Sequence, residues 1–286
     1  MTRWLVTGAG GQLGRELVDH LAASGVDVVG LDRRALDVAD RTSVAAAFTE
    51  HRPDVVVNTA AYTAVDAAET DVDGATAVNT VAPGLLAAQA RRHGARLLHV
   101  STDYVFAGDA TRPYEVDDPT APASVYGRSK RDGEIAALEA HPEATHVVRT
   151  AWVYGRHGGN FVRTMMGLEA TRDTVDVVDD QTGAPTWTYD LARGLAELGA
   201  RTDVAPGVLH LTNAGSTTWC GLARAVFAAV GADPDRVHPT TSDRFVRPAP
   251  RPAYSVLSGA AWEHAGLTPL QEWSAALAEA RIATWR

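Results

Sequence analysis

The chain has 286 residues, of which 45% are apolar and 21% are charged, a composition typical of a globular protein and not of a disordered one. Its formal net charge of −9 argues against a nucleic-acid partner, which needs a basic face, but it allows a small anion held by backbone amides and single arginines. The single cysteine, Cys220, excludes an internal disulfide and is expected to pack in a helix. Because neither a signal peptide nor an apolar run of about 18 residues is predicted, we expect a cytoplasmic enzyme without a membrane partner.

The first 150 residues alternate short β-rich runs with longer helical ones. Strands are predicted at residues 4–7, 26–31, 55–57, 97–100 and 145–149. Helices are predicted at residues 13–23 and 42–51, the second capped by Asp40, and a helical stretch from 65 to 93 contains Pro83, which should kink it or mark a new start. This alternation predicts a parallel doubly wound sheet, which binds ligands where the carboxyl ends of its strands meet.

The second half of the chain is less regular. Strands are predicted at residues 173–178 and 208–211, and helices at 191–198, 217–230, 259–265 and 270–282. Residues 242–252 are rich in proline and arginine and predict a binding loop. We therefore expect an α/β protein with a Rossmann-type doubly wound parallel sheet and a smaller C-terminal substrate-binding lobe. Residues 1–150, joined by parts of 174–225, form the dinucleotide-binding domain in this prediction, and residues 151–173 and 226–286 form the lobe.

A glycine-rich turn joins the first predicted strand to the first helix. Its spacing is G-x-x-G-x-x-G, and the residues expected to contact a cofactor are Gly8, Gly11, Gln12, Leu13 and Gly14. Such a turn needs glycine torsions, and it lets a pyrophosphate approach the backbone at a helix N-terminus. Its position between a buried strand and an amphipathic helix predicts dinucleotide binding.

Charged residues after the second strand bear on the choice of cofactor. Asp32 lies 18 residues beyond Gly14, where an acid can hold the ribose hydroxyls of NAD. Arg33 and Arg34 follow it, and either could pair with the 2′-phosphate of NADP. The prediction favours NADP(H), with NAD(H) as the alternative, and Asp37 and Val38 in the next loop could reach the adenine.

A candidate catalytic group combines a tyrosine, a lysine and a hydroxyl. Tyr126 and Lys130 are four residues apart on a predicted helix and so share one face of it. A free tyrosine has a pKa of about 10, and a nearby ammonium, helped by an oxidised nicotinamide, should move that pKa toward the working pH. Thr102 follows the fourth strand, where a hydroxyl can hydrogen-bond a substrate carbonyl. Together these residues predict a carbonyl-reducing site.

With these motifs the chain resembles the dTDP-4-dehydrorhamnose reductase family, a branch of the extended short-chain dehydrogenases/reductases. The segments that carry the resemblance are 8–14, 58–69, 78–79, 101–106, 125–130, 149–155, 160–161, 180–186, 217–219 and 247–252. The resemblance implies reduction at C4 of a 6-deoxy-4-keto sugar carried on dTDP, and it leaves open which deoxysugar is the substrate.

The resemblance also implies roles for individual residues. Tyr126 would protonate the substrate oxygen, Thr102 would tune the tyrosine and Lys130 would bind ribose. The further cofactor contacts it implies are Ala60, Ala61, Thr63 and Asn79, the last supporting the lysine through water. The substrate contacts it implies are Thr102, Asp103, Trp152 on the sugar and Arg251 on the pyrophosphate. It implies a possible homodimer, with Mg²⁺ bound at a contact lined by glutamates. Glu16 fits such a contact, but Tyr189 and Asp190 stand where another glutamate is expected.

Two alternatives remain open at the level of sequence. A 4-epimerase on the same scaffold would keep its cofactor tightly bound, and a non-catalytic NADP-binding regulatory subunit of the methionine adenosyltransferase type would not need Tyr126, Lys130 and Thr102 together. Similar 4,6-dehydratases carry an Asp-Glu pair after the threonine, whereas here Tyr104 follows Asp103, so the elimination machinery is missing. The scattered histidines have no ligand spacing, so no catalytic metal is expected.

Overall fold

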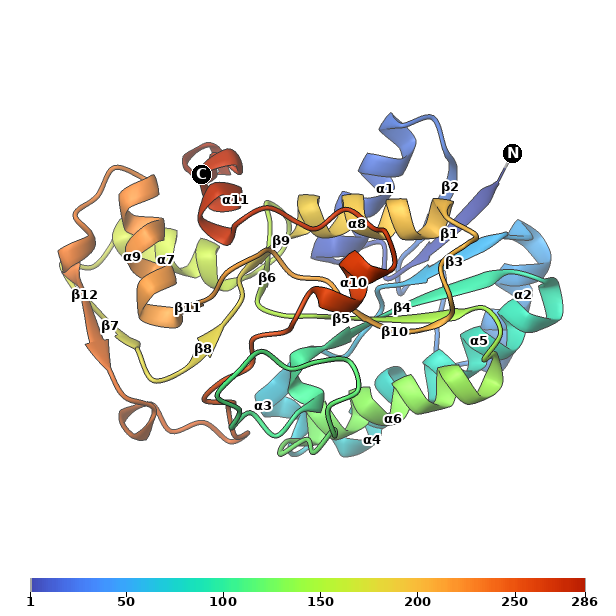
Figure 1. The fold of residues 1–286 in the computed structure, drawn as a ribbon, viewed down its shortest axis with the longest axis horizontal. Coiled ribbons are helices and arrows are strands. Elements are labelled where there is room, and N and C mark those ends of the chain that lie inside the picture. Colours follow the sequence, from blue (N-terminus) through green and yellow to red (C-terminus); the bar gives the residue numbers. More distant parts are fainter. Residues whose placement is uncertain (1, 286) are drawn as a thin grey trace.

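A central sheet of six strands organises the chain, whose structure is a computed structural model that describes residues 2–285. All neighbouring strands pair in parallel, in the order β10-β5-β4-β3-β1-β2 (Figure 1). The strands are β1 (Arg3–Thr7), β2 (Asp27–Leu31), β3 (Val55–Asn58), β4 (Arg96–Thr102), β5 (Thr145–Thr150) and β10 (Gly207–His210). Because β2 and β3 lie on opposite sides of β1, strand order reverses between β1 and β3, and the predicted doubly wound parallel sheet is confirmed.

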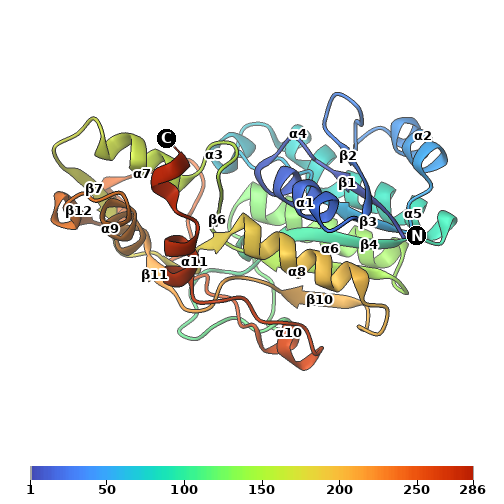
Figure 2. The ribbon, with the colours of Figure 1, turned by 90° about the horizontal axis from the view of Figure 1, so that it is seen from above.

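Helices cover both faces of this sheet (Figures 1 and 2). One face packs against α1 (Gln12–Ala23), α8 (Thr188–Ala200) and α10 (Ala260–His264), with Leu17 and Leu191 fully buried between them. The other face packs against α2 (Arg41–His51), α5 (Ala82–His93) and α6 (Val125–Ala140), with Phe48 and Leu86 in that core. Asp40 caps α2 by accepting a hydrogen bond from Thr42 N at 2.8 Å, as predicted.

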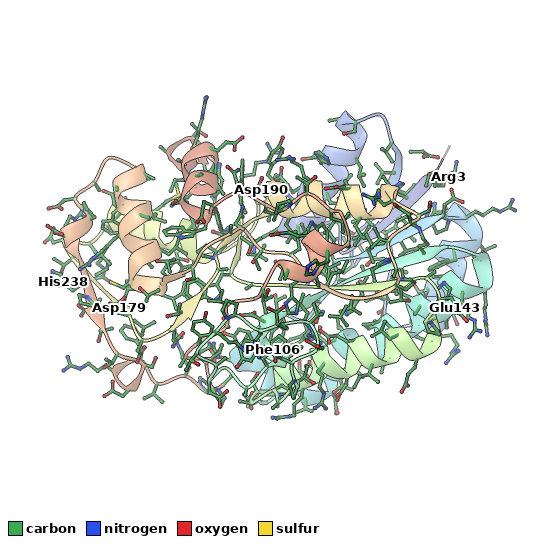
Figure 3. All side chains as sticks on the ribbon, in the orientation of Figure 1. Arg3, Phe106, Glu143, Asp179, Asp190 and His238 are labelled. Carbon is green, nitrogen blue, oxygen red and sulfur yellow. The ribbon has the colours of Figure 1, made fainter. Side chains whose placement is uncertain are left out.

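A smaller lobe lies beyond the carboxyl ends of the strands. It contains α7 (Phe161–Glu169), α9 (Trp219–Ala229) and α11 (Trp273–Glu279), with β7 (Val175–Val178) paired in parallel to β12 (Val237–Thr240). Short strands link it to the sheet domain: β6 (Val153–Tyr154) with β9 (Thr186–Trp187), and β8 (Thr182–Gly183) with β11 (Thr217–Thr218). Figure 3 places His238 and Asp179 at the lobe end of the molecule and Arg3, which begins β1, at the opposite end. The carboxyl ends of the strands therefore face the lobe.

The predicted helical stretch from 65 to 93 is divided in the structure. It consists of α3 (Val65–Ala68), α4 (Val72–Thr76), one turn of π-helix (Ala77–Val81) and then α5. The break before α4 arises because Asp71 caps a new helix by accepting from Gly74 N at 3.1 Å. Pro83 stands in the first turn of α5, but Val81 and Ala82 before it keep helical torsions, so the helix continues from the π-turn into α5 and the new start lies at α4 and not at Pro83. The π-turn carries Asn79, which is buried.

Other predicted elements are shorter than the sequence indicated. The helix predicted at 217–230 begins at Trp219, because Thr217–Thr218 pairs with β8 and Thr218 caps the helix. The last predicted helix is reduced to α11. Cys220 is buried in α9, as expected.

The division into two domains stays a prediction, and packing indicates where its boundary would run. Segment 188–210 packs with the large sheet through α8 and β10, whereas β7 and α9 belong to the lobe. Trp262 of α10 and Leu267 are buried in the core of the large sheet, so this part of 226–286 lies with the sheet domain. Within residues 2–285, no helix has both the length and the apolar character needed to cross a bilayer.

Candidate active site

The glycine turn between β1 and α1 presents open backbone at the switch point of the sheet. Gly8 has φ +70°, and a Cβ there would lie 2.6 Å from Ala60 N. A Cβ on Gly14 would lie 2.4 Å from Gly8 O, so neither position tolerates a side chain. Gly11 is the N-cap of α1, and the first N–H groups of that helix are available to a negatively charged group. These features fit the pyrophosphate of a dinucleotide.

The side chains of the same turn have separate roles. Leu13 is buried in the core under α1, so only its backbone faces the turn. The Gln12 amide contacts the lobe instead: its Nε2 donates to Gly159 O at 3.1 Å, and its Oε1 accepts from Asn160 Nδ2 at 2.9 Å. Gln12 therefore links the glycine turn to the start of α7.

The predicted adenosine-side residues lie beyond β2, beside the glycine turn. A Cβ on Gly10 would lie 3.3 Å from Asp32 Cβ, which shows how close the acid is to the turn. Asp32 Oδ1 accepts from the backbone N–H groups of Arg34 and Ala35, and these hydrogen bonds lower the pKa of Asp32. Arg33 is exposed.

The structure separates the two residues of the following loop. Asp37 is exposed, with its Oδ1 accepting from Ala39 N at 3.0 Å, whereas the side chain of Val38 is buried in the core beneath α2. A contact between the Val38 side chain and an adenine would therefore require that side chain to leave its core.

The loop after β3 is held against α6 by Asn79. Its Oδ1 accepts from Tyr62 N at 2.9 Å, and its Nδ2 donates to Tyr62 O and to Ser129 Oγ. Ala60 and Ala61 of this loop are half-buried beside the glycine turn, and Thr63 is exposed. Asn79 thus orders the loop and touches the residue next to Lys130, and its predicted water-mediated support of the lysine stays a prediction.

Tyr126 lies buried at the start of α6, next to the end of β4. Burial raises its pKa to about 12, a hydrogen bond with Thr102 opposes the rise, and the charge of Asp103 adds to it. The neighbouring ammonium was expected to lower the pKa of Tyr126, but in this structure that pKa is raised. Tyr126 is instead a protonated phenol whose hydroxyl meets that of Thr102.

Lys130 is buried one helical turn beyond Tyr126. Its Nζ donates to Val100 O at 2.7 Å and lies 3.5 Å from Nε2 of His99. Burial lowers the pKa of Lys130 to about 8, and the charge of Glu134 opposes the shift. It is the only lysine of the chain, in which lysines and arginines together number 26.

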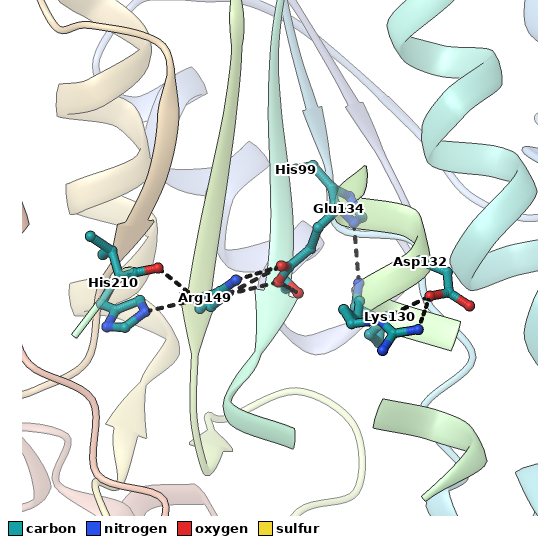
Figure 4. A network of polar contacts seen from close by, with 9 residues as sticks. His99, Lys130, Asp132, Glu134, Arg149 and His210 are labelled. Carbon is teal, nitrogen blue, oxygen red and sulfur yellow. Dashed lines mark hydrogen bonds and ion pairs between the residues drawn. The ribbon is translucent and has the colours of Figure 1, made fainter. Parts of the chain in front are cut away.

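A buried ion pair fixes α6 against the sheet (Figure 4). Arg149 of β5 forms two-pronged contacts with the carboxylate of Glu134, the shortest from Nη2 to Oε2 at 2.8 Å. The same carboxylate accepts from the hydroxyl of Ser101, the residue before Thr102. Arg149 also lies 4.9 Å from the centre of the Phe106 ring. Because Glu134 is on the helix that carries Tyr126 and Lys130, this pair sets the position of both.

Asp103 is a buried acid at the end of β4. Its Oδ1 accepts from Thr102 Oγ1 at 2.9 Å. Burial raises its pKa to about 6, and the hydrogen bond from Thr102 opposes the rise.

A cavity of about 490 Å³ opens between the two parts of the chain next to this group. Its walls include the aromatic and apolar side chains Tyr104, Phe161, Met165, Leu168, Trp219 and Phe245, and the charged or polar side chains Asp66, Gln181, Arg247 and Arg251. The ring of Tyr104 packs edge-to-face on that of Tyr126, with 5.5 Å between centroids, so the phenol lies behind the cavity wall. A cavity lined both by apolar side chains and by two arginines suits a ligand that has a ring and a phosphate group.

The predicted substrate residues Trp152 and Arg251 lie at or near this cavity. Arg251 Nη2 forms an ion pair with Asp66 at 2.9 Å, and Asp66 also accepts from Ala249 N, which fastens loop 242–252 to α3. Trp152 has φ +45° and stacks on Trp219 at 3.5 Å between ring centroids. One face of the Trp152 indole is therefore covered, and its contact with a sugar stays a prediction.

Glu16 already has a cation beside it within this chain, and Mg²⁺ at a contact between two copies stays a prediction. Glu16 Oε2 is buried without a hydrogen bond, but the guanidinium of Arg156 lies 3.6 Å from it and already supplies a positive charge. Asp190 accepts from Asn213 and Gln271, and Tyr189 packs against His20. The described part of the chain brings no three Asp, Glu, His or Cys side chains together in a way that could hold a metal ion.

Several site residues were not predicted. His99, Glu134 and Arg149 were missed. His99 and Arg149 are polar residues inside apolar strands, and Glu134 shares the helix face of Lys130 at a further spacing of four. Phe161, Met165 and Phe245 were missed as cavity walls because no local pattern distinguishes them from core residues.

Comparison with known proteins places this geometry in a family. The sequence model of the family described as "RmlD substrate binding domain" matches residues 2–284. The chain is 57% identical to a probable dTDP-4,6-dihydroxy-2-methyloxan-3-one 4-ketoreductase of Streptomyces antibioticus, over 97% of this chain and 94% of the relative. It is 55% identical to a dTDP-4-dehydrorhamnose reductase of Streptomyces griseus, over 97% and 92%. A crystal structure of dTDP-4-dehydrorhamnose reductase from Bacillus anthracis in complex with NADP has a TM-score of 0.94 and 34% identity, covering 99% of each chain.

The glycine turn generates a prediction about cofactor binding. Replacing Gly14 by Ala would place the new methyl group 2.4 Å from Gly8 O and force the turn open, although alanine is the better helix former. We expect the Kd for a dinucleotide, measured by fluorescence titration, to rise by about tenfold or more. The matched control is Gly167→Ala in α7, where a Cβ meets no atom within 4 Å. Equal affinity in the two variants would contradict this interpretation of the turn.

The raised pKa of Asp103 generates a prediction about stability. A buried acid whose folded pKa is above its unfolded value stabilises the fold at low pH, and this stability is lost as the pH rises through about 6. At about 1.4 kcal/mol per pKa unit, the free energy of unfolding should fall by up to about 3 kcal/mol between pH 4 and pH 7. Asp103→Asn should remove this slope in urea denaturation at the two pH values, whereas Asp117→Asn, at an exposed position, should keep it. An unchanged slope in Asp103→Asn would refute the assignment.

Proposed function

The chain belongs to the RmlD substrate binding domain family, and from that premise we propose that it is a nicotinamide-dependent reductase of dTDP-4-keto-6-deoxysugars. The proposed reaction converts dTDP-4-dehydrorhamnose to dTDP-L-rhamnose by reduction of the C4 ketone. The observation that carries the proposal is the buried pair of hydroxyls, Tyr126 and Thr102, which meet at the end of β4 beside Tyr104, a residue of the cavity wall.

Tyr126 acts as the proton donor in this reaction. Its pKa of about 12 keeps the phenol protonated at neutral pH, as an acid must be before the reduction begins. As negative charge develops on the ketone oxygen, the hydroxyls of Tyr126 and Thr102 stabilise it, and the Tyr126 proton completes the alcohol. Tyr104 fills the place after Asp103 with a ring packed on Tyr126, so no second acid stands there to remove water from the sugar.

The cofactor-side residues would hold NADP(H) in preference to NAD(H). When bound, the reduced nicotinamide supplies a hydride from its C4 to the ketone carbon. Gly8, Gly11 and Gly14 accommodate the pyrophosphate at the N-terminus of α1, and Lys130 would hold the nicotinamide ribose. The exposed Arg33 supports pairing with a 2′-phosphate, since the carboxylate of Asp32 already accepts two backbone N–H groups.

The substrate-side residues complete the proposed site. Arg251, with Arg247 on the same loop, would face the pyrophosphate of the nucleotide, and Asp66 keeps Arg251 at the cavity edge until the ligand binds. The apolar wall formed by Phe161, Met165 and their neighbours would accept the base. Asp103 and Trp152 would contact the sugar. A homodimer and a cytoplasmic location stay predictions.

The substrate can be tested directly, because relatives with similar identity carry names that refer to different keto sugars. dTDP-4-keto-6-deoxyglucose is supplied with or without a 3,5-epimerase, and oxidation of NADPH or NADH is followed by absorbance. We expect oxidation only with the epimerase, and faster with NADPH. Oxidation without the epimerase would reject the rhamnose assignment. No net oxidation, with NAD already bound to the purified protein, would indicate an epimerase in place of a reductase.

The role of Tyr126 can be tested by Tyr126→Phe. The variant keeps the ring and its contact with Tyr104 but loses the acidic proton, so kcat should fall by about 10²–10⁴-fold while the Kd for NADPH stays near the wild-type value. Tyr189→Phe, on α8 and outside the cavity wall, is the matched control and should retain its turnover. A Tyr126→Phe rate close to wild type would place the proton donor elsewhere.

A further inference from the structure

A line of buried polar groups runs across the carboxyl ends of β1, β3 and β4 to Lys130. Thr7 Oγ1 donates to Asn58 Oδ1 at 2.6 Å, Asn58 Nδ2 contacts His99 Nδ1 at 3.0 Å, and His99 Nε2 lies 3.5 Å from Lys130 Nζ (Figure 4 shows the last contact). Thr7 and His99 are fully buried, and Asn58 is 1% exposed. The proposed reaction gives no role to Thr7, Asn58 or His99.

The orientation of the Asn58 amide is fixed by a backbone donor. The N–H of Ala60 donates to Asn58 Oδ1 at 3.2 Å, and a backbone N–H can only donate. Rotating the amide by half a turn would bring its NH₂ against both Ala60 N–H and the Thr7 hydroxyl. The Nδ2 group of Asn58 therefore faces His99 and donates to it.

This orientation decides the tautomer of His99. Its Nδ1 must accept the hydrogen bond from Asn58, so in the neutral ring the proton is on Nε2. Burial, and then the charge of Lys130, lower the pKa of His99 well below its ordinary value, so the ring is neutral at physiological pH. An N–H donor of His99 is thus aimed at the nitrogen of Lys130.

The two protonation states of Lys130 respond differently to that donor. A neutral amine has a lone pair that accepts the Nε2–H of His99 while one of its own N–H groups donates to Val100 O. An ammonium has no lone pair, so the same His99 N–H faces a positive charge with nothing to accept it. The contact therefore stabilises the neutral amine relative to the ammonium.

We propose that His99 is a positioning residue that stabilises the neutral amine of Lys130 through its Nε2–H and so lets this lysine exchange its proton near neutrality. His99 from β4 contacts the lysine, and the charge of Glu134 on α6 acts on it. Tyr126 lies one turn before the lysine on the same helix. Burial opposes the ammonium and Glu134 favours it. In this proposal the Nε2–H of His99 adds to the effect of burial.

The consequence for turnover rests on the proposed function. After Tyr126 has given its proton to the substrate oxygen, the phenolate has to regain one. An ammonium that loses a proton readily can supply it: an N–H bond of Lys130 breaks, the proton passes through water to the phenolate, the O–H bond of Tyr126 forms, and the neutral amine is reprotonated from solvent. A permanently charged lysine would be slower in this step.

The test uses the fact that the chain has one lysine. Protein labelled with ¹³C at lysine Cε gives a single lysine signal, whose chemical shift is followed from pH 5.5 to 10.5 in the absence of cofactor. The test variant is His99→Asn, in which the side-chain oxygen takes the place of Nδ1 and keeps the bond to Asn58, while the amide is too short to reach Lys130. His99→Leu removes both contacts. The matched control is His146→Asn, which changes a buried histidine of β5 whose Nε2 contacts Val204 O.

We expect a wild-type midpoint at or below about 8, and midpoints about one pH unit higher in His99→Asn and His99→Leu. His146→Asn should stay at the wild-type value. A lysine midpoint in His99→Asn that is equal to or below the wild-type midpoint would overturn the proposal, even if the midpoint in His99→Leu rises. In that case His99 would act only through its bond to Asn58. A shift of equal size in His146→Asn would also overturn it.

Kinetics separate this inference from the proposed function. If the enzyme reduces the dTDP-keto sugar, the apparent pKa at which kcat falls at alkaline pH should be higher in His99→Asn, by as many pH units as the lysine midpoint. If this apparent pKa does not change, the proposed effect on turnover is overturned. If no reduction is found in the wild type, the reductase proposal fails, while the lysine titration still decides the role of His99.

Discussion

The buried ion pair between Glu134 and Arg149 is the constraint on which the candidate site depends. It ties α6 to β5, and its carboxylate also accepts a hydrogen bond from Ser101 on β4. The Glu134 carboxylate therefore joins α6, β5 and β4. Tyr126, Lys130 and Glu134 follow each other at spacings of four on one helix, and fixing the last fixes the other two. Burying two charges is costly, and the pair is tolerable because the carboxylate has two hydrogen-bonding partners and Arg149 also packs on Phe106. Removing one partner would leave a buried charge, which typically costs about 3–5 kcal/mol.

Burial also sets the protonation of the groups that this pair positions. The pKa of Tyr126 is raised to about 12 and that of Asp103 to about 6, while the pKa of Lys130 is lowered to about 8, and burial is the largest cause in each case. Each shift favours the neutral form, because the interior solvates charge poorly. A phenol that stays protonated is suited to giving a proton to a developing alkoxide. A lysine that titrates close to neutrality is suited to returning it.

Sequence reasoning succeeded where a function depends on local chain geometry. The glycine turn follows from torsions that only glycine adopts without strain, and Tyr126 and Lys130 follow from helical periodicity. It failed where a residue's role depends on a partner far along the chain. Glu134 and Arg149 were missed for that reason, because they meet only in the fold. The cofactor contacts of Gln12 and Val38 stay predictions, although the Gln12 amide binds Gly159 and Asn160 and the Val38 side chain is buried beneath α2. The helical stretch from 65 to 93 was read as one pattern because no periodicity reveals that Asp71 would cap a new helix or that a π-turn would direct Asn79 inward.

By itself the sequence determined the alternation of strands and helices, the glycine turn at the first crossover, and the tyrosine–lysine pair on one helix face. These features are encoded in spacings of a few residues, which fix backbone geometry locally. Only the tertiary structure decided which polar groups meet: Glu134 with Arg149, Asp66 with Arg251, and Asn58 with His99 and Lys130. Those pairs join strands and helices that are distant in the chain, and a buried donor or charge is stable only where the fold brings it a partner.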